Sequence, residues 1–141
     1  MSVSLSAFLA QNADKVGKVS VVASQRFHDE SGKPIPWEIG CITAGENAKL
    51  RKSCMKQVAV GKGQYTTVFD SNAYLEKVAV RCTLFPDLQN TELQNSYGCM
   101  DAEQLIVTML TPGEFEDYST AVLKANGFKD EQELVDEAKN S

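Results

Sequence analysis

The sequence predicts an α+β fold that is mostly α-helical, with an N-terminal helix and a β-hairpin followed by a bundle of about five short helices. Two apolar, β-branched runs flank a turn in the first third of the chain, which is the pattern of a hairpin. Capping-box residues and apolar residues at three- and four-residue spacing follow, which is the pattern of amphipathic helices. At 141 residues the chain fits one domain, residues 1–141, with the hairpin at about 19–43 and the helical part at about 44–139.

The first element is a short amphipathic helix expected over residues 5–12, with Ser4 as its N-cap. Residues 19–27 and 35–43 are predicted to form the two strands of the hairpin, because apolar and β-branched side chains predominate in both. The sequence HDESGKP between them supplies typical turn residues.

A second helix is expected to begin at Ala44, because Thr43 and Glu46 form a capping-box pattern. Its apolar stripe consists of Leu50, Cys54 and Val58, which recur at four-residue spacing. The sequence GKG at residues 61–63 interrupts this pattern and predicts a loop that runs to Phe69.

Further helix starts are predicted at residues that commonly act as N-caps. These residues are Asp70, Asn90, Asp101 and Thr111. Thr111 is followed by Pro112 and Glu114, which combines a cap, a proline at the first helical position and a capping-box carboxylate. A last acidic helix is expected in the sequence DEQELVDEAKN, after Gly127.

The sequence predicts no catalytic, cofactor-binding or metal-binding residues, and we expect a protein that is not an enzyme. The one histidine, His28, lies at the predicted turn beside two acidic residues, where a solvated ring is expected. The cysteines Cys41, Cys54, Cys82 and Cys99 contain no Cys-x-x-Cys pair, so we expect buried free thiols.

Charge is distributed unevenly along the chain, with a net charge of +4 over residues 1–62, −2 over residues 63–100 and −7 over residues 101–141. This polarity is compatible with self-association from head to tail, or with an acidic face that meets a basic partner. Lys49, Lys52 and Lys56 are predicted to share one helix face. The patch is small, lacks interleaved aromatic residues and lies on an acidic protein, which argues against nucleic acid as the partner.

The start of the chain, MSVSLSAFLAQNA, has no basic flank and too few consecutive apolar residues for a signal peptide or a membrane-spanning helix. We therefore expect a cytoplasmic protein with no membrane partner.

The order and spacing of several short segments resemble the XkdN-like phage tail assembly chaperones of contractile-tailed phages and prophages. The segments are SAFLAQNA, VASQRFHDESGKPIPWEIGCIT, LRKSC, GQYT, NAYLEKVAV, CTLFPDL, ELQNSYG, MLTPGE and ELVDEAKN. The resemblance implies a chaperone that binds the tape measure protein, keeps it soluble and promotes assembly of the tail tube, with the tail tube protein as a possible second partner. It also implies location in the host bacterial cytoplasm and absence from the mature virion.

We expect Phe115, Tyr118, Leu134 and Val135 to contribute the partner-binding surface, because they are apolar positions on strongly acidic C-terminal helices. Two alternatives stay open: a structural tail protein that is retained in the virion, and a small nucleic-acid-binding regulator that uses the three lysines.

Overall fold

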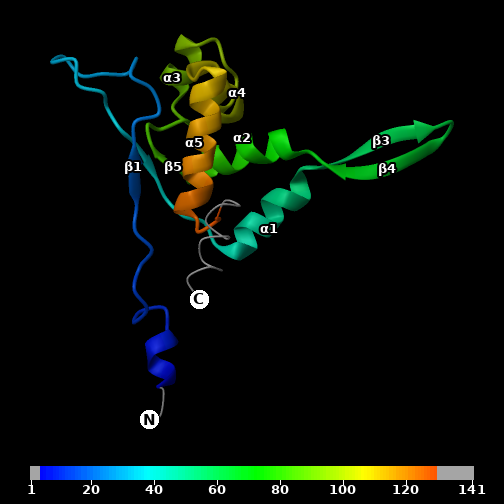
Figure 1. Cartoon of the computed structure of the whole chain (residues 1–141), viewed down its shortest axis with the longest axis horizontal. Coiled ribbons are helices and arrows are strands. Elements are labelled where there is room, and N and C mark those ends of the chain that lie inside the picture. Colours follow the sequence, from blue (N-terminus) through cyan, green and yellow to red (C-terminus); the bar gives the residue numbers. More distant parts are fainter. Residues whose placement is uncertain (1–3, 130–141) are drawn as a thin grey trace, which may run out of the picture.

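The structure is a computed structural model that describes residues 4–129. Within these residues it contains two antiparallel sheets and five α-helices (Figure 1). The larger sheet has the strand order β1-β2-β5, and the smaller sheet is the hairpin β3-β4. The strands are β1 (Val19–Val21), β2 (Trp37–Ile39), β3 (Met55–Gly61), β4 (Gln64–Phe69) and β5 (Thr83–Phe85).

The helices are α1 (Ala44–Ser53), α2 (Ser71–Cys82), α3 (Thr91–Ser96), α4 (Ala102–Met109) and α5 (Pro112–Ala125). Helix α2 is central, because α1, α4 and α5 all pack against it. Its buried side chains include Val78, Ala79 and Cys82, which meet Ile106 of α4 and Val122 of α5 in one apolar core. Burying an aliphatic side chain of this size contributes about 1.5–3 kcal/mol, so this core is the main source of stability.

The predicted helix starts are confirmed in detail. Thr43 accepts a hydrogen bond from the Glu46 amide, and the Glu46 carboxylate accepts one in return from the Thr43 amide. Thr111 and Glu114 form the same reciprocal pair at the start of α5. The other predicted caps, Asp70, Asn90 and Asp101, each accept from an amide in the first turn of their helix. The predicted helix in residues 130–140 lies outside the described residues.

The prediction of a mostly helical fold is wrong, and the largest error lies in residues 55–69. Helix α1 ends at Ser53, whose hydroxyl donates to the Leu50 carbonyl, and Val58 lies on a strand. Strands β3 and β4 then pair along their length, from Met55 opposite Phe69 to Gly61 opposite Gln64. The β-branched and aromatic residues of the sequence QYTTVF favour a strand, and Gly63 occupies the positive-φ position that the turn requires.

The N-terminal part also differs from the prediction. The expected helix over residues 5–12 is a short 3₁₀ helix, Leu5–Phe8, although Ser4 does cap it. Strands β1 and β2 pair antiparallel as three-residue strands, Val19 opposite Ile39. A third strand, β5, joins β2 on its other side immediately after α2. The fold is therefore α+β with a substantial share of strand.

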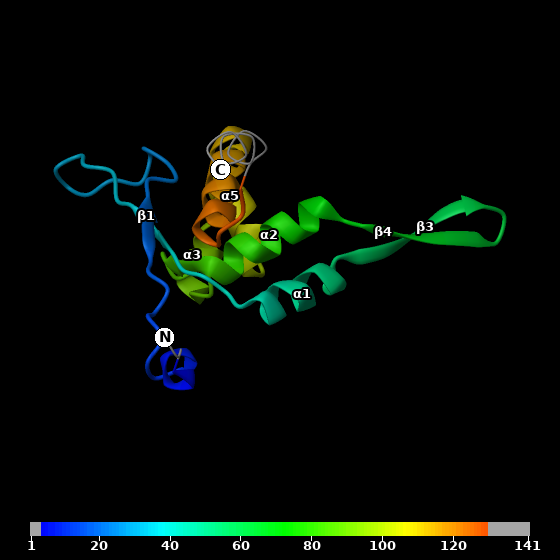
Figure 2. The same cartoon turned by 60° about the horizontal axis from the view of Figure 1, so that its bottom comes forward.

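Two segments project from the packed body of helices and sheet (Figures 1 and 2). The β3-β4 hairpin points away from the packed helices α2, α4 and α5, and all residues of β3 are exposed. The N-terminal segment extends in another direction, with Leu5 77% and Phe8 71% exposed.

Two valine substitutions test the corrected position of residues 55–69. Val78→Ala is expected to lower the free energy of unfolding by about 2 kcal/mol, because Val78 is 1% exposed in the core. Val58→Ala is expected to lower it by less than about 1 kcal/mol, because Val58 is 39% exposed on the hairpin. Urea denaturation followed by circular dichroism measures both. Equal losses would contradict the hairpin and favour Val58 in a helical core.

Candidate interaction surfaces

The four residues predicted to bind a partner do not form one described surface. Phe115 is half-buried on α5, where it packs against the core. Tyr118 is 2% exposed and belongs to the core itself. Leu134 and Val135 lie outside the described residues. The sequence places an apolar residue on a helix but does not reveal whether its side chain faces the core or a partner. The side chain of Tyr118 faces the core.

Tyr118 connects three elements. Its ring meets Trp37 of β2 edge to face, with ring centroids 5.0 Å apart. Its hydroxyl lies 2.7 Å from the Thr83 hydroxyl, which itself donates to the Ala79 carbonyl at 2.6 Å. Because Thr83 has one proton to donate, it accepts from Tyr118. Burial raises the pKa of Tyr118 to about 12, so the phenol stays protonated and keeps its donor.

An ion pair fastens the loop after β1 to the start of α5. Arg26 donates to the Glu114 carboxylate at 2.9 Å and to the Met109 carbonyl at 2.6 Å. Hydrogen bonds from the Ser24 hydroxyl, the Thr111 amide and Arg26 lower the pKa of Glu114 to about 2. The Glu114 carboxylate therefore serves both the helix cap and the loop.

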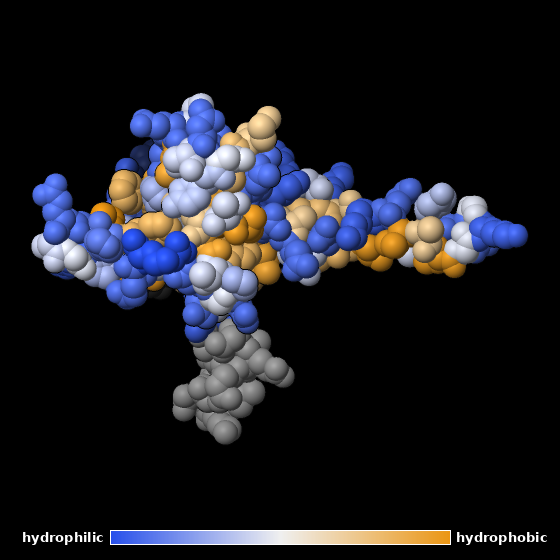
Figure 3. Space-filling view, turned by 90° about the horizontal axis from the view of Figure 1, so that it is seen from above, coloured by the Kyte–Doolittle hydropathy of each residue, from blue (hydrophilic) through white to orange (hydrophobic). Residues whose placement is uncertain are grey.

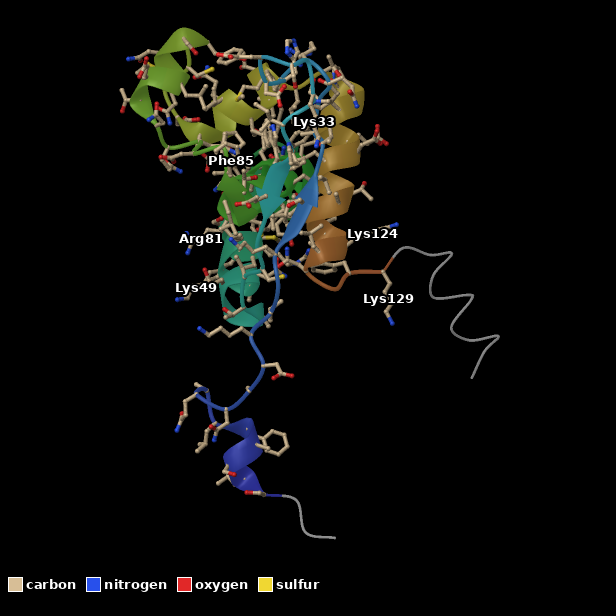
Figure 4. The ribbon with its side chains drawn as sticks, turned by 90° about the vertical axis from the view of Figure 1, so that its left-hand side faces the viewer. Lys33, Lys49, Arg81, Phe85, Lys124 and Lys129 are labelled. Atoms are coloured by element: carbon tan, nitrogen blue, oxygen red, sulfur yellow. The ribbon has the colours of Figure 1, made fainter. Side chains whose placement is uncertain are left out.

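An apolar hollow opens where this loop meets the sheet and α4. Its volume is about 170 Å³, and a cavity of about 150 Å³ lined by apolar side chains is enough to bind benzene. Trp37 is buried in its lining, whereas Phe85 is 47% and Ile35 is 37% exposed (Phe85 is labelled in Figure 4). The complete lining is Phe27, Ile35, Trp37, Phe85, Pro86, Leu93 and Met109. The hollow suits one large apolar side chain from a partner.

The predicted basic face of a single helix is wrong, because the helix ends before its third lysine. Lys49 and Lys52 lie exposed on α1, whereas Lys56 lies on β3 and forms an ion pair with Asp70 at 3.4 Å. Figure 4 shows Lys49 and Arg81 on the opposite side of the molecule from Lys124 of α5. The basic side chains continue along the hairpin to Lys62 at its turn.

The hairpin also carries exposed apolar side chains. Val58 is 39%, Val60 is 62% and Tyr65 is 66% exposed. Figure 3 shows apolar residues along one side of the projecting hairpin and hydrophilic residues at its end. Clustered exposed apolar residues on a projecting element are characteristic of a site of protein contact.

Within residues 4–129, no group of three or more histidine, cysteine, aspartate or glutamate side chains is placed to hold a metal ion. Cys54, Cys82 and Cys99 are buried, as predicted, and Cys41 is half-buried. None of the described helices is long and apolar enough to cross a membrane.

An apolar hollow and a projecting hairpin with exposed apolar side chains are features typical of proteins that bind other proteins. The sequence model of the phage XkdN-like tail assembly chaperone proteins matches residues 5–139. The chain belongs to this family.

Two relatives come from Bacillus subtilis (strain 168). The phage-like element PBSX protein XkdN is 29% identical over 140 residues, which cover 96% of this chain and 93% of that protein. The protein YqbN is 28% identical over 137 residues, which cover 95% and 91% of the two chains. A crystal structure of YqbN shares this fold, with a TM-score of 0.76 at 24% identity, over 92% of this chain and 100% of that chain.

Substitutions of Tyr118 test its role in the core. Tyr118→Phe is expected to lower the free energy of unfolding by about 0.5–1.5 kcal/mol, because one hydrogen bond is lost. Tyr118→Ala is expected to lower it by about 3–5 kcal/mol, because a buried aromatic ring is removed. Tyr65→Ala, at a 66% exposed tyrosine, is the matched control. Equal effects of the two alanine substitutions in urea denaturation would contradict the core assignment.

The lowered pKa of Glu114 predicts a pH-dependent contribution to stability. The contribution is complete above the ordinary pKa of 4.5 and is lost as the pH falls toward about 2, where the folded protein takes up the proton. The Tm difference between the wild type and Glu114→Gln should therefore be largest at neutral pH and shrink in acid. Glu116→Gln removes the same charge without touching Arg26 and is the control. A Tm difference that stays constant into acid would contradict this account.

Proposed function

We propose that this chain is a chaperone that binds the tape measure protein of a phage or prophage tail, keeps it soluble and promotes assembly of the tail tube. The match to the tail assembly chaperone family along residues 5–139 carries the proposal. The relative XkdN belongs by name to a phage-like element, which is consistent with a role in a phage-derived particle.

The apolar hollow gives this proposal a contact point. An amphipathic helix binds a partner by placing apolar side chains from successive turns into a groove. The hollow of about 170 Å³ accommodates one such side chain, and Phe85, which is 47% exposed, supplies its accessible aromatic surface. We propose that a helix of the tape measure protein inserts a leucine or an aromatic residue here.

A second proposal is that the C-terminal helices bind the same partner. Phe115 is half-buried on α5, near the exposed acidic residues Glu116 and Asp117. A surface of Phe115, Leu134 and Val135 would also present apolar side chains within an acidic surrounding.

We further propose that the protein acts in the host bacterial cytoplasm and leaves before the virion is complete. Mass spectrometry of purified particles separates this role from that of a structural tail protein. Its absence from the particles supports the chaperone role, and stoichiometric retention contradicts it.

Co-expression with the tape measure protein of the same phage element tests the function and its site. The wild-type chain should make the tape measure protein soluble and co-elute with it in size-exclusion chromatography. Phe85→Ser should weaken the complex at least about tenfold, because removal of a central aromatic anchor typically costs about 2 kcal/mol or more. Met100→Ser, at an 87% exposed apolar residue away from the hollow, is the matched control.

Each component of this experiment has its own contradictory result. An insoluble tape measure protein in the presence of the wild-type chain would contradict the function. Unchanged binding by Phe85→Ser would contradict the hollow as the site, and loss of binding by Phe115→Ser alone would transfer the site to α5. Circular dichroism of each variant verifies that it is folded.

A further inference from the structure

We propose that this chain self-associates from head to tail, with the basic arm of one copy docking on the acidic surface of the next. The basic arm is α1 together with the β3-β4 hairpin, residues 44–69, and the acidic surface is formed by α4 and α5 beside β1. This inference goes beyond binding of the tape measure protein and does not depend on it.

The two surfaces are complementary in charge. Residues 47–69 contain no acidic residue and five basic ones: Lys49, Arg51, Lys52, Lys56 and Lys62. Residues 101–123, which include α4 and most of α5, contain no basic residue and five acidic ones: Asp101, Glu103, Glu114, Glu116 and Asp117. Patches of opposite charge steer two molecules toward each other and fix their orientation. The chain itself therefore supplies both halves of a complementary pair.

The arm exposes backbone groups and apolar side chains that a partner is able to cover. Every residue of β3 and the first four residues of β4 are exposed. A two-stranded hairpin is marginally stable alone, and its open edges offer unpaired backbone donors and acceptors to another chain. Near its end the hairpin also exposes Val60 at 62% and Tyr65 at 66%.

The base of the arm is held firmly on the body. The Arg51 guanidinium lies 4.4 Å from the Phe69 ring centroid and 5.4 Å from that of Tyr74. The Asp70 amide donates to the Cys54 carbonyl at 2.8 Å, and Lys56 pairs with the Asp70 carboxylate at 3.4 Å. An arm fixed at its base has less conformational freedom to lose on docking.

The acidic surface offers a place for the end of the arm. A hollow of about 120 Å³ lies between β1 and α5, with Asp117 and Glu114 beside the apolar side chains of Val22 and Ala121. Val22 is 45% exposed, so the hollow combines an accessible apolar wall with negative charge. Tyr65 suits the apolar wall, and Lys62 suits Asp117.

The arm must dock on another copy, because within one chain the hairpin projects away from α5 and cannot reach it (Figure 1). The two surfaces also differ from each other, so the contact is heterologous. Heterologous contacts build rings or open chains of subunits, whereas contacts between identical patches stop at a dimer.

Sedimentation velocity of the purified chain over a range of concentrations tests the proposal. The wild type should form oligomers that grow with concentration and weaken at high salt. Lys62→Glu and Asp117→Lys should each weaken association at least about tenfold, because each places like charges opposite one another. Lys56 and Glu114 are left unchanged, because each forms an ion pair within its own chain.

Mixing the two variants gives the sharpest result. In the mixture, the unchanged arm of the Asp117→Lys chain meets the unchanged acidic surface of the Lys62→Glu chain, and the two substituted positions meet with their charges exchanged. The mixture should therefore recover oligomers in which the two variants alternate, although neither variant associates well alone. The double variant Lys62→Glu, Asp117→Lys should recover oligomers, because the pair is restored with its charges exchanged. Tyr65→Ser should weaken association without altering charge.

Charge reversals on the exposed loop before β2, Lys33→Glu and Glu30→Lys, are the matched controls and should associate as the wild type does. A wild-type chain that stays monomeric at every concentration would overturn the proposal, whether or not its basic arm binds DNA or RNA. Lys62→Glu and Asp117→Lys chains that each associate as strongly as the wild type would overturn it as well. The assay contains no tape measure protein, so its outcome is independent of the proposed function.

Discussion

The side chain of Tyr118 is the contact on which the packed body depends. It places α5 against Trp37 of the sheet and against Thr83 at the junction of α2 and β5. The end of the same helix holds the link between β2 and α1, because the Asn126 side chain accepts from the Ile42 amide at 2.9 Å. The Cys41 thiol donates to the Ala125 carbonyl at 3.0 Å and adds to this connection. Helix α5 therefore closes the core, and the hairpin and the N-terminal segment are the parts that project beyond it.

The sequence predicts the helix starts well, because a cap is a local interaction between a side chain and a nearby amide. Thr43 and Thr111 each carry their partner glutamate three residues later, and the structure forms both capping boxes. The β3-β4 hairpin is not evident from the sequence because Leu50, Cys54 and Val58 match helical spacing, although the helix ends at Ser53 and Val58 lies on a strand. Strand β5 is set by its pairing with β2, which no local pattern of three residues reveals.

The candidate surfaces were harder to predict than the fold. The basic residues of the arm are visible in the sequence, but their position on a projecting hairpin is not. The apolar hollow combines residues from the loop before β2, from β5 and from α3 and α4, so only the folded chain brings Ile35, Phe85, Leu93 and Met109 together. Tyr118 has the apolar spacing of a surface anchor on an acidic helix, and tertiary packing makes it a core residue.

A small chaperone is able to combine a stable core with exposed apolar groups when the two are separate in space, as they are here. Hydrogen–deuterium exchange of the chain, alone and with the tape measure protein, tests this separation directly. On binding, exchange should become slower around the hollow, in residues 27–37 and 83–93, and should stay unchanged in the part of α5 around Tyr118. Faster exchange around Tyr118 on binding would contradict it, because the partner would then act by opening the core.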